Sequence, residues 1–359
     1  DVKRYIAHIN LKKIGSFGQK KIIDTKVLII GVGGLGSPIA LYLASSGINN
    51  IGIADHDKID ISNLHRQVIY KSSAVGKSKA EEAKRMILEL NPEVKADAFA
   101  EKLSAKNAVS LFEKYDIIVD ATDHIAIKYL INDACLLTNK PMVYGSIFRF
   151  QGQVSVFNYQ NGPTYRCLYP NENSNSLNCE DAGVIGTSVG IIGMLQANEV
   201  LKMILGIGEV LSGKILVYTI LNNEQQKYDF DKSDIQPINR EKFEAKYNTV
   251  ENRVEEIDFQ EIAEEINKDE VLFLDVRNED ELPKINLKYS IQIPLKNLES
   301  EIEKLDKNQL IYVFCQSGIR SKIAALLFQK HQFKNIKSIA GGVLAMKQFL
   351  KEEIKIGAD

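Results

Sequence analysis

The sequence predicts an α/β protein in two parts: a doubly wound, mostly parallel sheet extended by antiparallel strands, and a smaller α/β unit after it. Short apolar runs alternate with helical patterns from Lys26 onward, which is typical of a parallel sheet with helices on both faces. The alternating run GQVSVFNY at 152–159 indicates an antiparallel strand that closes this sheet. A second, shorter alternation of strands and helices follows residue 256.

Each expected element rests on its own pattern. Apolar, often β-branched runs bounded by polar residues predict strands at 26–30, 50–55, 94–100, 115–123, 141–147, 152–159, 214–220, 271–277, 290–294, 310–316 and 336–342. Apolar residues at helical spacing predict helices at 37–46, 77–90, 185–205 and 298–305 and from 321 onward. The Asn- and Ser-rich piece Pro170–Gly183 has no periodicity and predicts a mobile loop.

The length of 359 residues favours two domains, and a polar stretch of mixed charge that contains Pro237 marks the boundary between them. We expect domains at 1–235 and 256–359, joined by a linker at 236–255. The net charge is -2, from 45 basic and 47 acidic residues, so the chain has no uniform field that would hold nucleic acid or an anionic membrane. Small molecules or proteins are the expected partners.

Cysteine usage and hydropathy indicate the compartment. The four cysteines form no C-x-x-C pair, so neither a disulfide framework nor a four-cysteine zinc site is predicted. The most apolar segment, 185–205, contains Gln, Asn, Glu and Lys, and the first residues do not have the pattern of an export signal. We therefore expect no membrane span and a cytoplasmic location.

A glycine-rich turn follows the first strand. Gly31, Gly33 and Gly36 have the G-x-G-x-x-G spacing of a Rossmann-like nucleotide cradle, in which the backbone approaches phosphate closely and a helix begins behind it. Asp55 ends the next strand and is well placed to accept hydrogen bonds from ribose hydroxyls. These features alone leave open an NAD-dependent dehydrogenase, or a glycine turn that serves packing only.

The residues after this turn favour a triphosphate. Asn63 and Arg66 follow the strand that Asp55 ends, and Lys79 opens the next helix, so more positive charge converges than a dinucleotide needs. Asp120 and Asp123 end another strand at the same edge, where a carboxylate could hold magnesium against phosphate. The alternatives are that the two cations are simply solvated and that Asp123 caps a helix.

A second site is predicted at Cys315, which follows the apolar run LIYVF and precedes a turn that leads into a helix. Amides of such a turn, the helix N-terminus and Arg320 would favour the thiolate, so a reactive cysteine is expected. The alternative is a buried thiol that ends a strand.

The first part resembles the MoeB/ThiF-type adenylyltransferases, relatives of the ubiquitin-activating enzymes. The segments that carry the resemblance, between residues 4 and 228, are RYIAHINL, IGSFGQKKI, GVGGLGS, DHDKIDISNLHRQ, VGKSKA, DATD, GQVSVF, YRCLYP and GMLQANEVLK. The resemblance implies that ATP and magnesium adenylate the C-terminal glycine of a ubiquitin-like sulfur carrier, and that the enzyme is a homodimer. It also assigns residues: the nucleotide roles fall on Gly34, Asp55, Asn63, Arg66, Lys79 and Asp123, with Asp123 as the magnesium ligand.

Three positions depart from the family pattern. Ala7 stands where the family usually has an arginine that reaches the phosphates of the neighbouring subunit, and His124 replaces a common asparagine. Thr164 stands where a C-x-x-C would begin, which leaves Cys167 alone. We therefore expect no structural zinc site.

The second part, roughly 256–356, resembles the rhodanese sulfurtransferases through FLDVRNEDEL, IQIPLKNL, CQSGIR and IAGGVLAMKQF. The resemblance implies that Cys315 carries a persulfide, that Arg320 positions the donor or polarises the site, and that Asp275 and Arg277 form a buried pair. Cys179 matches a reactive cysteine of sulfur-transferring relatives of the first part. We interpret the two remaining cysteines, Cys135 and Cys167, as small core side chains.

Together the two resemblances predict an enzyme that activates a carrier carboxylate and converts it to a thiocarboxylate, in molybdopterin or thiamin biosynthesis. A sulfur donor such as a cysteine desulfurase would load Cys315. Two alternatives remain open from the sequence: an NAD-dependent oxidoreductase and a non-catalytic scaffold that binds a carrier.

Overall fold

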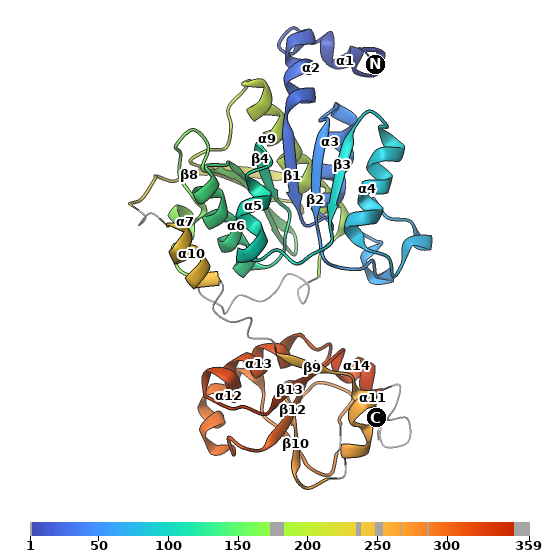
Figure 1. The fold of residues 1–359 in the computed structure, drawn as a ribbon, viewed down its shortest axis with the longest axis vertical. Coiled ribbons are helices and arrows are strands. Elements are labelled where there is room, and N and C mark those ends of the chain that lie inside the picture. The colour runs from blue at the N-terminus through green and yellow to red at the C-terminus, as the bar shows by residue number, and fades with distance from the viewer. Residues whose placement is uncertain are drawn as a thin grey trace. The chain divides into compact units, whose positions relative to one another are not determined.

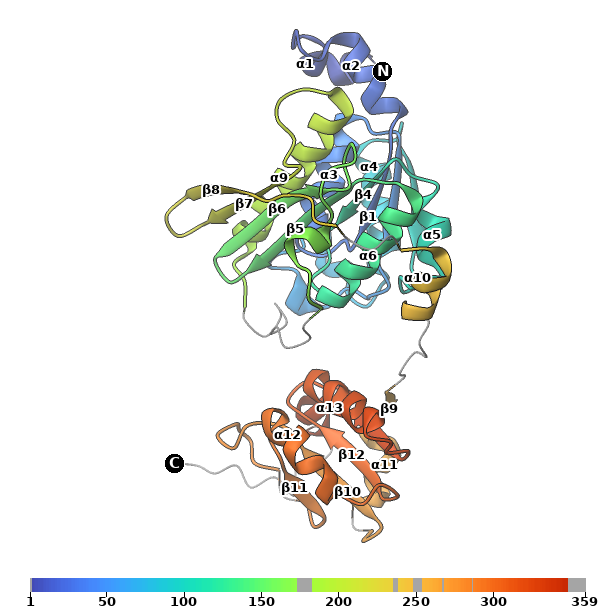
Figure 2. The same cartoon turned by 90° about the vertical axis from the view of Figure 1, so that its left-hand side faces the viewer.

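The computed structural model describes residues 2–172, 183–234, 238–247, 254–266, 268–285 and 287–347. The chain divides into two compact units, residues 1–248 and 249–359, each with its own sheet. Figures 1 and 2 show the elements of each unit from two directions. The fold class is the one that the sequence predicts.

An eight-stranded sheet with the order β3-β2-β1-β4-β5-β6-β7-β8 forms the centre of the first unit. Strands β1 to β5 run parallel, and β6, β7 and β8 extend the sheet in antiparallel fashion (Figure 2). The bounds are β1 (Lys26–Ile30), β2 (Asn50–Ala54), β3 (Lys95–Phe99), β4 (Ile117–Asp120), β5 (Met142–Phe148), β6 (Gln151–Phe157), β7 (Lys214–Thr219) and β8 (Glu224–Asp229). The antiparallel extension confirms the prediction made from GQVSVFNY.

Helices cover both faces of this sheet. Their bounds are η1 (Val2–Tyr5), α1 (Ile6–Ile9), α2 (Gly15–Asp24), α3 (Gly36–Ser46), η2 (Ile61–Asn63), η3 (Ser72–Ala74), α4 (Lys79–Leu90), α5 (Ala105–Phe112), α6 (Ile125–Thr138), α7 (Tyr165–Leu168), α9 (Gly186–Leu205) and α10 (Arg240–Tyr247). Alternate residues of each parallel strand enter two separate cores. On β1, Val27 and Ile29 face α3, α4 and α9, whereas Leu28 and Ile30 face α5 and α6.

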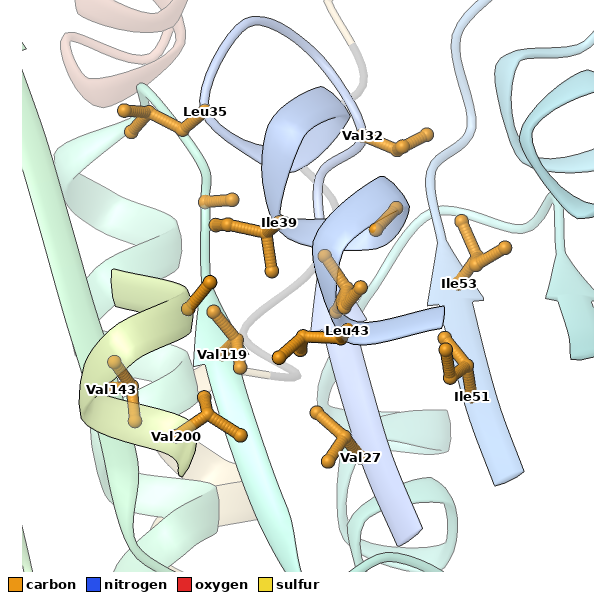
Figure 3. Packing of buried hydrophobic residues seen from close by; sticks show 14 of the residues in the cluster. Val27, Val32, Leu35, Ile39, Leu43, Ile51, Ile53, Val119, Val143 and Val200 are labelled. Atoms are coloured by element: carbon orange, nitrogen blue, oxygen red, sulfur yellow. The ribbon is translucent and has the colours of Figure 1, made fainter. Parts of the chain in front are cut away.

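The core under α3 supports the start of that helix, where the glycine turn ends. Ile39 and Leu43 of α3 lie with Val27 of β1 and Val119 of β4 in this core, and all four are fully buried (Figure 3). Burying an aliphatic side chain of this size contributes about 1.5–3 kcal/mol. The N-terminus of α3 is therefore held rigidly above the carboxyl edge of the sheet.

Helix α9 is the one described helix that is long and apolar enough to cross a membrane, but half of its apolar window is buried within the unit. It packs closely on α3, because a Cβ at Gly193 would lie 2.5 Å from the carbonyl oxygen of Leu35. It also covers β5 through Gln196, whose amide lies against Gly145. These contacts are those of a core helix.

Part of the expected linker is structured. Helix α10 lies within 236–255 and packs on α5 and α6, because Phe243 is fully buried in their core. Tyr247 donates a hydrogen bond to Asp133 of α6 at 2.7 Å. Within the range expected as a linker, Arg240–Tyr247 therefore form a polar helix that Phe243 and Tyr247 anchor to the first unit.

The second unit contains a parallel sheet with the order β11-β10-β12-β13-β9 (Figure 1). Its strands are β9 (Glu255–Ile257), β10 (Val271–Asp275), β11 (Ser290–Gln292), β12 (Leu310–Phe314) and β13 (Ile336–Ile339). Its helices are α11 (Phe259–Ile262), η4 (Ala263–Glu265), α12 (Leu295–Glu301), η5 (Ile302–Lys304), α13 (Ile319–Lys330) and α14 (Gly342–Met346). Strand β12 is the middle strand of the five and is almost entirely buried, so Cys315, which follows it, lies in the middle of the sheet edge.

Candidate functional site

The glycine turn of the first unit is built for close backbone approach. Gly31 has a φ of 83°, which side chains rarely adopt, and a Cβ at Gly36 would lie 2.1 Å from the carbonyl oxygen of Gly31. A Cβ at Gly34 would lie 2.5 Å from Val189 of α9. A side chain at any of these positions would fill the turn. The amides of Gly31 and Val32 already donate to Ala54 and Asp55, so the amides that follow them, at the N-terminus of α3, are the candidates for binding a ligand.

Strand register brings three chain segments to this turn. Ile30, Ala54 and Asp120 are paired across β1, β2 and β4, so the residues that follow them meet at one edge. The carboxylate of Asp55 accepts a hydrogen bond from the amide of Val32 at 2.8 Å. Burial raises the pKa of Asp55, against the charge of Lys79 and two backbone hydrogen bonds that lower it. Its remaining lone pairs can accept ribose hydroxyls.

Lys79 reaches the same edge from the N-terminus of α4. Its ammonium lies 2.9 Å from Asp57, a residue that the sequence motifs do not predict as part of the site. Partial burial alone would raise the pKa of Asp57, but the hydrogen bond and charge of Lys79 outweigh burial and lower it. The charge of His124 also lowers this pKa, so the residue after Asp123 lies within electrostatic reach of Asp57.

The loop after β2 brings an arginine and a glutamine to the glycine turn. The Cγ atom of Arg66 lies 3.6 Å from the position that a Cβ at Gly34 would take. The amide nitrogen of Gln67 lies 3.4 Å from the corresponding position at Gly33, and its buried oxygen has no hydrogen-bond partner among the described residues. Asn63 accepts a hydrogen bond from the amide of Asp60 and thereby shapes this loop.

A buried ion pair supports the loop that carries Asp123. Lys128 of α6 donates to Asp120 at 2.8 Å, to the carbonyl oxygen of Thr122 at 2.8 Å and to that of Gly145 at 3.0 Å. The side chain of Asp123 itself is exposed, and the N-cap of α6 is His124 rather than Asp123. The helix-cap alternative for Asp123 is therefore wrong. In the sequence, Lys128 interrupts the apolar pattern IAIKYLIND, and a lysine in such a pattern indicates a buried charge that needs a partner.

The structure thus gathers most of the predicted nucleotide residues around one turn. Asp55 binds the turn at Val32, Lys79 reaches Asp55 through Asp57, Arg66 lies against Gly34, and Asp123 follows β4 at the same edge. The side chain of Asn63 accepts a hydrogen bond from the backbone of its own loop. Ala7 lies on α1 with an exposed side chain.

In the second unit, Cys315 is 1% exposed and sits in a closely packed turn. The amide of Gly318 donates to its sulfur at 3.2 Å, and the sulfur lies 3.8 Å from the hydroxyl of Ser321. A Cβ at Gly342 of α14 would lie 2.1 Å from the carbonyl oxygen of Cys315. The expected turn therefore forms, and the amide contact of the sulfur is made by Gly318.

Two arginines flank this turn and both are paired. Arg320 contacts both carboxylate oxygens of Glu281, at 2.5 and 2.6 Å. Arg277 is fully buried and binds Asp275 through two nitrogens, which confirms the expected buried pair. Arg277 also donates to the side chain of Gln316, within the turn, at 3.2 Å.

The other cysteines differ from one another. Cys135 is fully buried among apolar residues, and burial raises its pKa well above the ordinary value, as expected of a core side chain. Cys167 is half-buried instead, and the same expectation is wrong for it. Burial would raise its pKa, but hydrogen bonds from Ser233 and Thr164 lower it. Cys179 lies outside the described residues.

These features define an α/β nucleotide-binding unit combined with a unit that presents a cysteine in a tight turn. Residues 5–237 match the model of the ThiF family, and residues 258–348 match that of the rhodanese-like domain. The chain belongs to the ThiF family and carries a C-terminal rhodanese-like domain.

Curated relatives share the whole two-part arrangement. The chain is 39% identical to a probable molybdopterin-synthase adenylyltransferase of Porphyra purpurea, over 98% of this chain and 94% of the relative. It is 35% identical to the adenylyltransferase and sulfurtransferase MOCS3 of Culex quinquefasciatus, over 99% of this chain and 89% of that relative. The protein is thus an enzyme of the adenylyltransferase and sulfurtransferase class, which sets aside the oxidoreductase and scaffold alternatives.

A solved structure shares the fold. The crystal structure of E. coli MccB with ATP matches with a TM-score of 0.56 and 23% identity, and covers 65% of this chain and 77% of that one. At this identity the likeness concerns the fold alone.

Proposed function

We propose that the first unit adenylates the C-terminal glycine carboxylate of a ubiquitin-like sulfur carrier, and that the second unit supplies sulfur to the activated carboxyl group. The observation that carries the proposal is the convergence of the glycine turn, Asp55, Lys79 and Arg66 at one sheet edge. The names of the relatives point to the carrier of molybdopterin synthase. The enzyme would act in the cytoplasm as a homodimer.

ATP fits the turn as a substrate. The amides of residues 33–36 at the N-terminus of α3 would hold phosphate, Asp55 would accept the ribose hydroxyls, and Arg66 and Lys79 would bind phosphate oxygens. The carrier carboxylate attacks the α-phosphorus, the bond to the bridging oxygen breaks, and pyrophosphate leaves with the electron pair. The cations and amides stabilise the charge that develops, and positioning lowers the rest of the barrier.

Magnesium fits the donor set at this edge. Asp123 has an exposed side chain three residues beyond the end of β4, and carboxylate oxygens are protein ligands that magnesium prefers. When bound there, the ion would neutralise phosphate charge. Lys128 keeps the backbone before Asp123 in place by binding Asp120 and the carbonyl oxygen of Thr122.

Sulfur transfer would use Cys315 as a persulfide. Its terminal sulfur attacks the carbonyl carbon of the acyl-adenylate, and AMP leaves. This step joins the carrier to Cys315 through an acyl disulfide, which a second thiolate opens to release the thiocarboxylate. Cys179 is our candidate for that second thiol. A cysteine desulfurase is a suitable donor for loading Cys315.

Replacement of Cys315 by alanine separates the two activities. Cys315→Ala should abolish the thiocarboxylate while carrier-dependent exchange of pyrophosphate into ATP continues at the wild-type rate, because no side chain of the second unit enters the adenylation step. Intact-mass spectrometry of the carrier detects replacement of oxygen by sulfur at its C-terminus. Loss of both activities in a folded variant would contradict the proposal.

A further inference from the structure

The arginine of the cysteine turn is engaged by a carboxylate. Each terminal nitrogen of Arg320 donates a short hydrogen bond to one carboxylate oxygen of Glu281. The carboxylate is itself held, because Glu281 accepts a hydrogen bond from the amide of Asn278 at 2.9 Å. The side chains are 28% and 25% exposed, so this bidentate pair lies at the boundary between the unit and solvent.

The charge of the pair persists at neutral pH. The hydrogen bond from Arg320 is the largest cause that holds the pKa of Glu281 below its ordinary value, and the charge of Arg277 acts in the same direction. Two more acidic residues, Glu279 and Asp280, precede Glu281 and are exposed. Segment 279–281 therefore carries three carboxyl groups, and the one of Glu281 binds Arg320.

We propose that Glu281 is the residue that selects the sulfur donor, because its carboxylate occupies Arg320 and so disfavours small anionic donors such as thiosulfate. The inference rests on the proposed role of Cys315 as the thiol that accepts sulfur. A dianion that binds Arg320 must displace Glu281 or share the guanidinium with its negative charge. A donor that carries its sulfur on a thiol needs no such cation.

The two loading reactions differ in their leaving groups. With thiosulfate, the thiolate of Cys315 attacks the outer sulfur, the sulfur–sulfur bond of thiosulfate breaks, and sulfite leaves with the electron pair and two negative charges. With a persulfide donor, the same attack on the outer sulfur releases a thiolate, which carries one negative charge. The first reaction requires a cation for the sulfonate group, and Glu281 competes for that cation.

The test compares the full-length wild type with Glu281→Gln, which keeps the size of the side chain and an oxygen for Asn278. Loading of Cys315 is followed by intact-mass spectrometry at a series of thiosulfate and of cysteine persulfide concentrations. We expect Glu281→Gln to lower the half-saturating concentration of thiosulfate by roughly ten-fold, since a charge-assisted pair at a partly exposed site is released. Loading by cysteine persulfide should change less than two-fold.

Two further variants make the outcome specific. Glu279→Gln removes an exposed carboxylate two residues away and should leave thiosulfate loading within two-fold, and Arg320→Gln in the Glu281→Gln background should cancel the gain. Circular dichroism confirms that each variant is folded. An unchanged or higher half-saturating concentration in folded Glu281→Gln would overturn the inference. Failure of the wild type to load from either donor would instead contradict the proposed function of Cys315.

Discussion

At the scale of single residues, the buried Lys128 ammonium holds the first site together. Its side chain is 3% exposed and that of Asp120 is fully buried, and three oxygen atoms surround the nitrogen. A charge in such a position is tolerated only while it is paired and hydrogen-bonded. Loss of the lysine would leave the Asp120 carboxylate buried without its counter-ion.

Lys128→Met should therefore lower the free energy of unfolding by about 3–5 kcal/mol, as expected when one partner of a buried pair is removed. Differential scanning calorimetry of the full-length variant measures the loss. Lys20→Met is the matched control: Lys20 pairs with Asp24 at 2.7 Å, but its side chain is 71% exposed. Its substitution should cost less than about 0.5 kcal/mol. Equal effects in the two variants would contradict the assigned role of Lys128.

Site residues that belong to a motif of fixed spacing could be predicted from the sequence, whereas the carboxylates that bind them could not. The glycines, Asp55 and Lys79 follow from one motif and its flanks, because parallel strands end at a common edge. Asp57 and Glu281 were not predicted, since each is one acid among several neighbours in its segment. Which of these carboxylates meets a cation depends on the course of the loop, and this is decided by tertiary contacts.

At the scale of elements, close packing between α9 and α3 positions the glycine turn. A Cβ at Gly193 would lie 2.5 Å from the carbonyl oxygen of Leu35, and backbone cannot yield as a side chain can. Gly190 lies one turn earlier on α9, where a Cβ would meet nothing within 4 Å. Helix α9 therefore contains one glycine at which a side chain would clash with backbone and one at which it would not.

Gly193→Ala should destabilise the protein by roughly 1–3 kcal/mol, because the added methyl group forces the two helices apart. It should also weaken ATP binding, since Leu35 directly precedes α3. Gly190→Ala should be neutral or stabilise by up to about 1 kcal/mol, because alanine is the better helix former. Calorimetry and isothermal titration with ATP measure both quantities. Loss of stability in Gly190→Ala as large as in Gly193→Ala would refute this explanation.

Elements with a long apolar pattern were predicted nearly to the residue. Helix α9 was expected at 185–205 and spans Gly186–Leu205, because its buried face repeats over many turns. Helix α10 was not predicted, because a single buried residue, Phe243, anchors an otherwise polar segment. The pattern of such a segment cannot be told from that of a linker.

At the scale of the whole molecule, the covalent link between the two units raises the local concentration of the sulfur on Cys315 near the acyl-adenylate formed by the first unit. A mixture of full-length Arg66→Ala, which is impaired in adenylation, and Cys315→Ala, which cannot carry sulfur, contains both activities on separate chains. The rate of thiocarboxylate formation per enzyme should rise with protein concentration in the mixture. For the wild type it should stay constant.

The measurement is thiocarboxylate formation at saturating carrier, ATP and sulfur donor over a hundred-fold range of enzyme concentration. Each variant alone serves as the control and should form little product. If the mixture matched the wild type at every concentration, covalent linkage of the units would have no kinetic role. Domain composition was predictable at this scale because each unit has its own sheet and its own motifs.

Arg277 limits how the cysteine turn can be engineered. Its guanidinium is buried and donates to Asp275, to the carbonyl oxygen of Pro283 and to Gln316. A turn transplanted from another sulfurtransferase without an acceptor at position 316 would leave one N–H of that buried guanidinium without its partner, while Pro283 keeps the other N–H of the same nitrogen. Donor preference is therefore better redesigned from outside the transplanted segment, at position 281, where the scaffold that holds the sulfur stays intact.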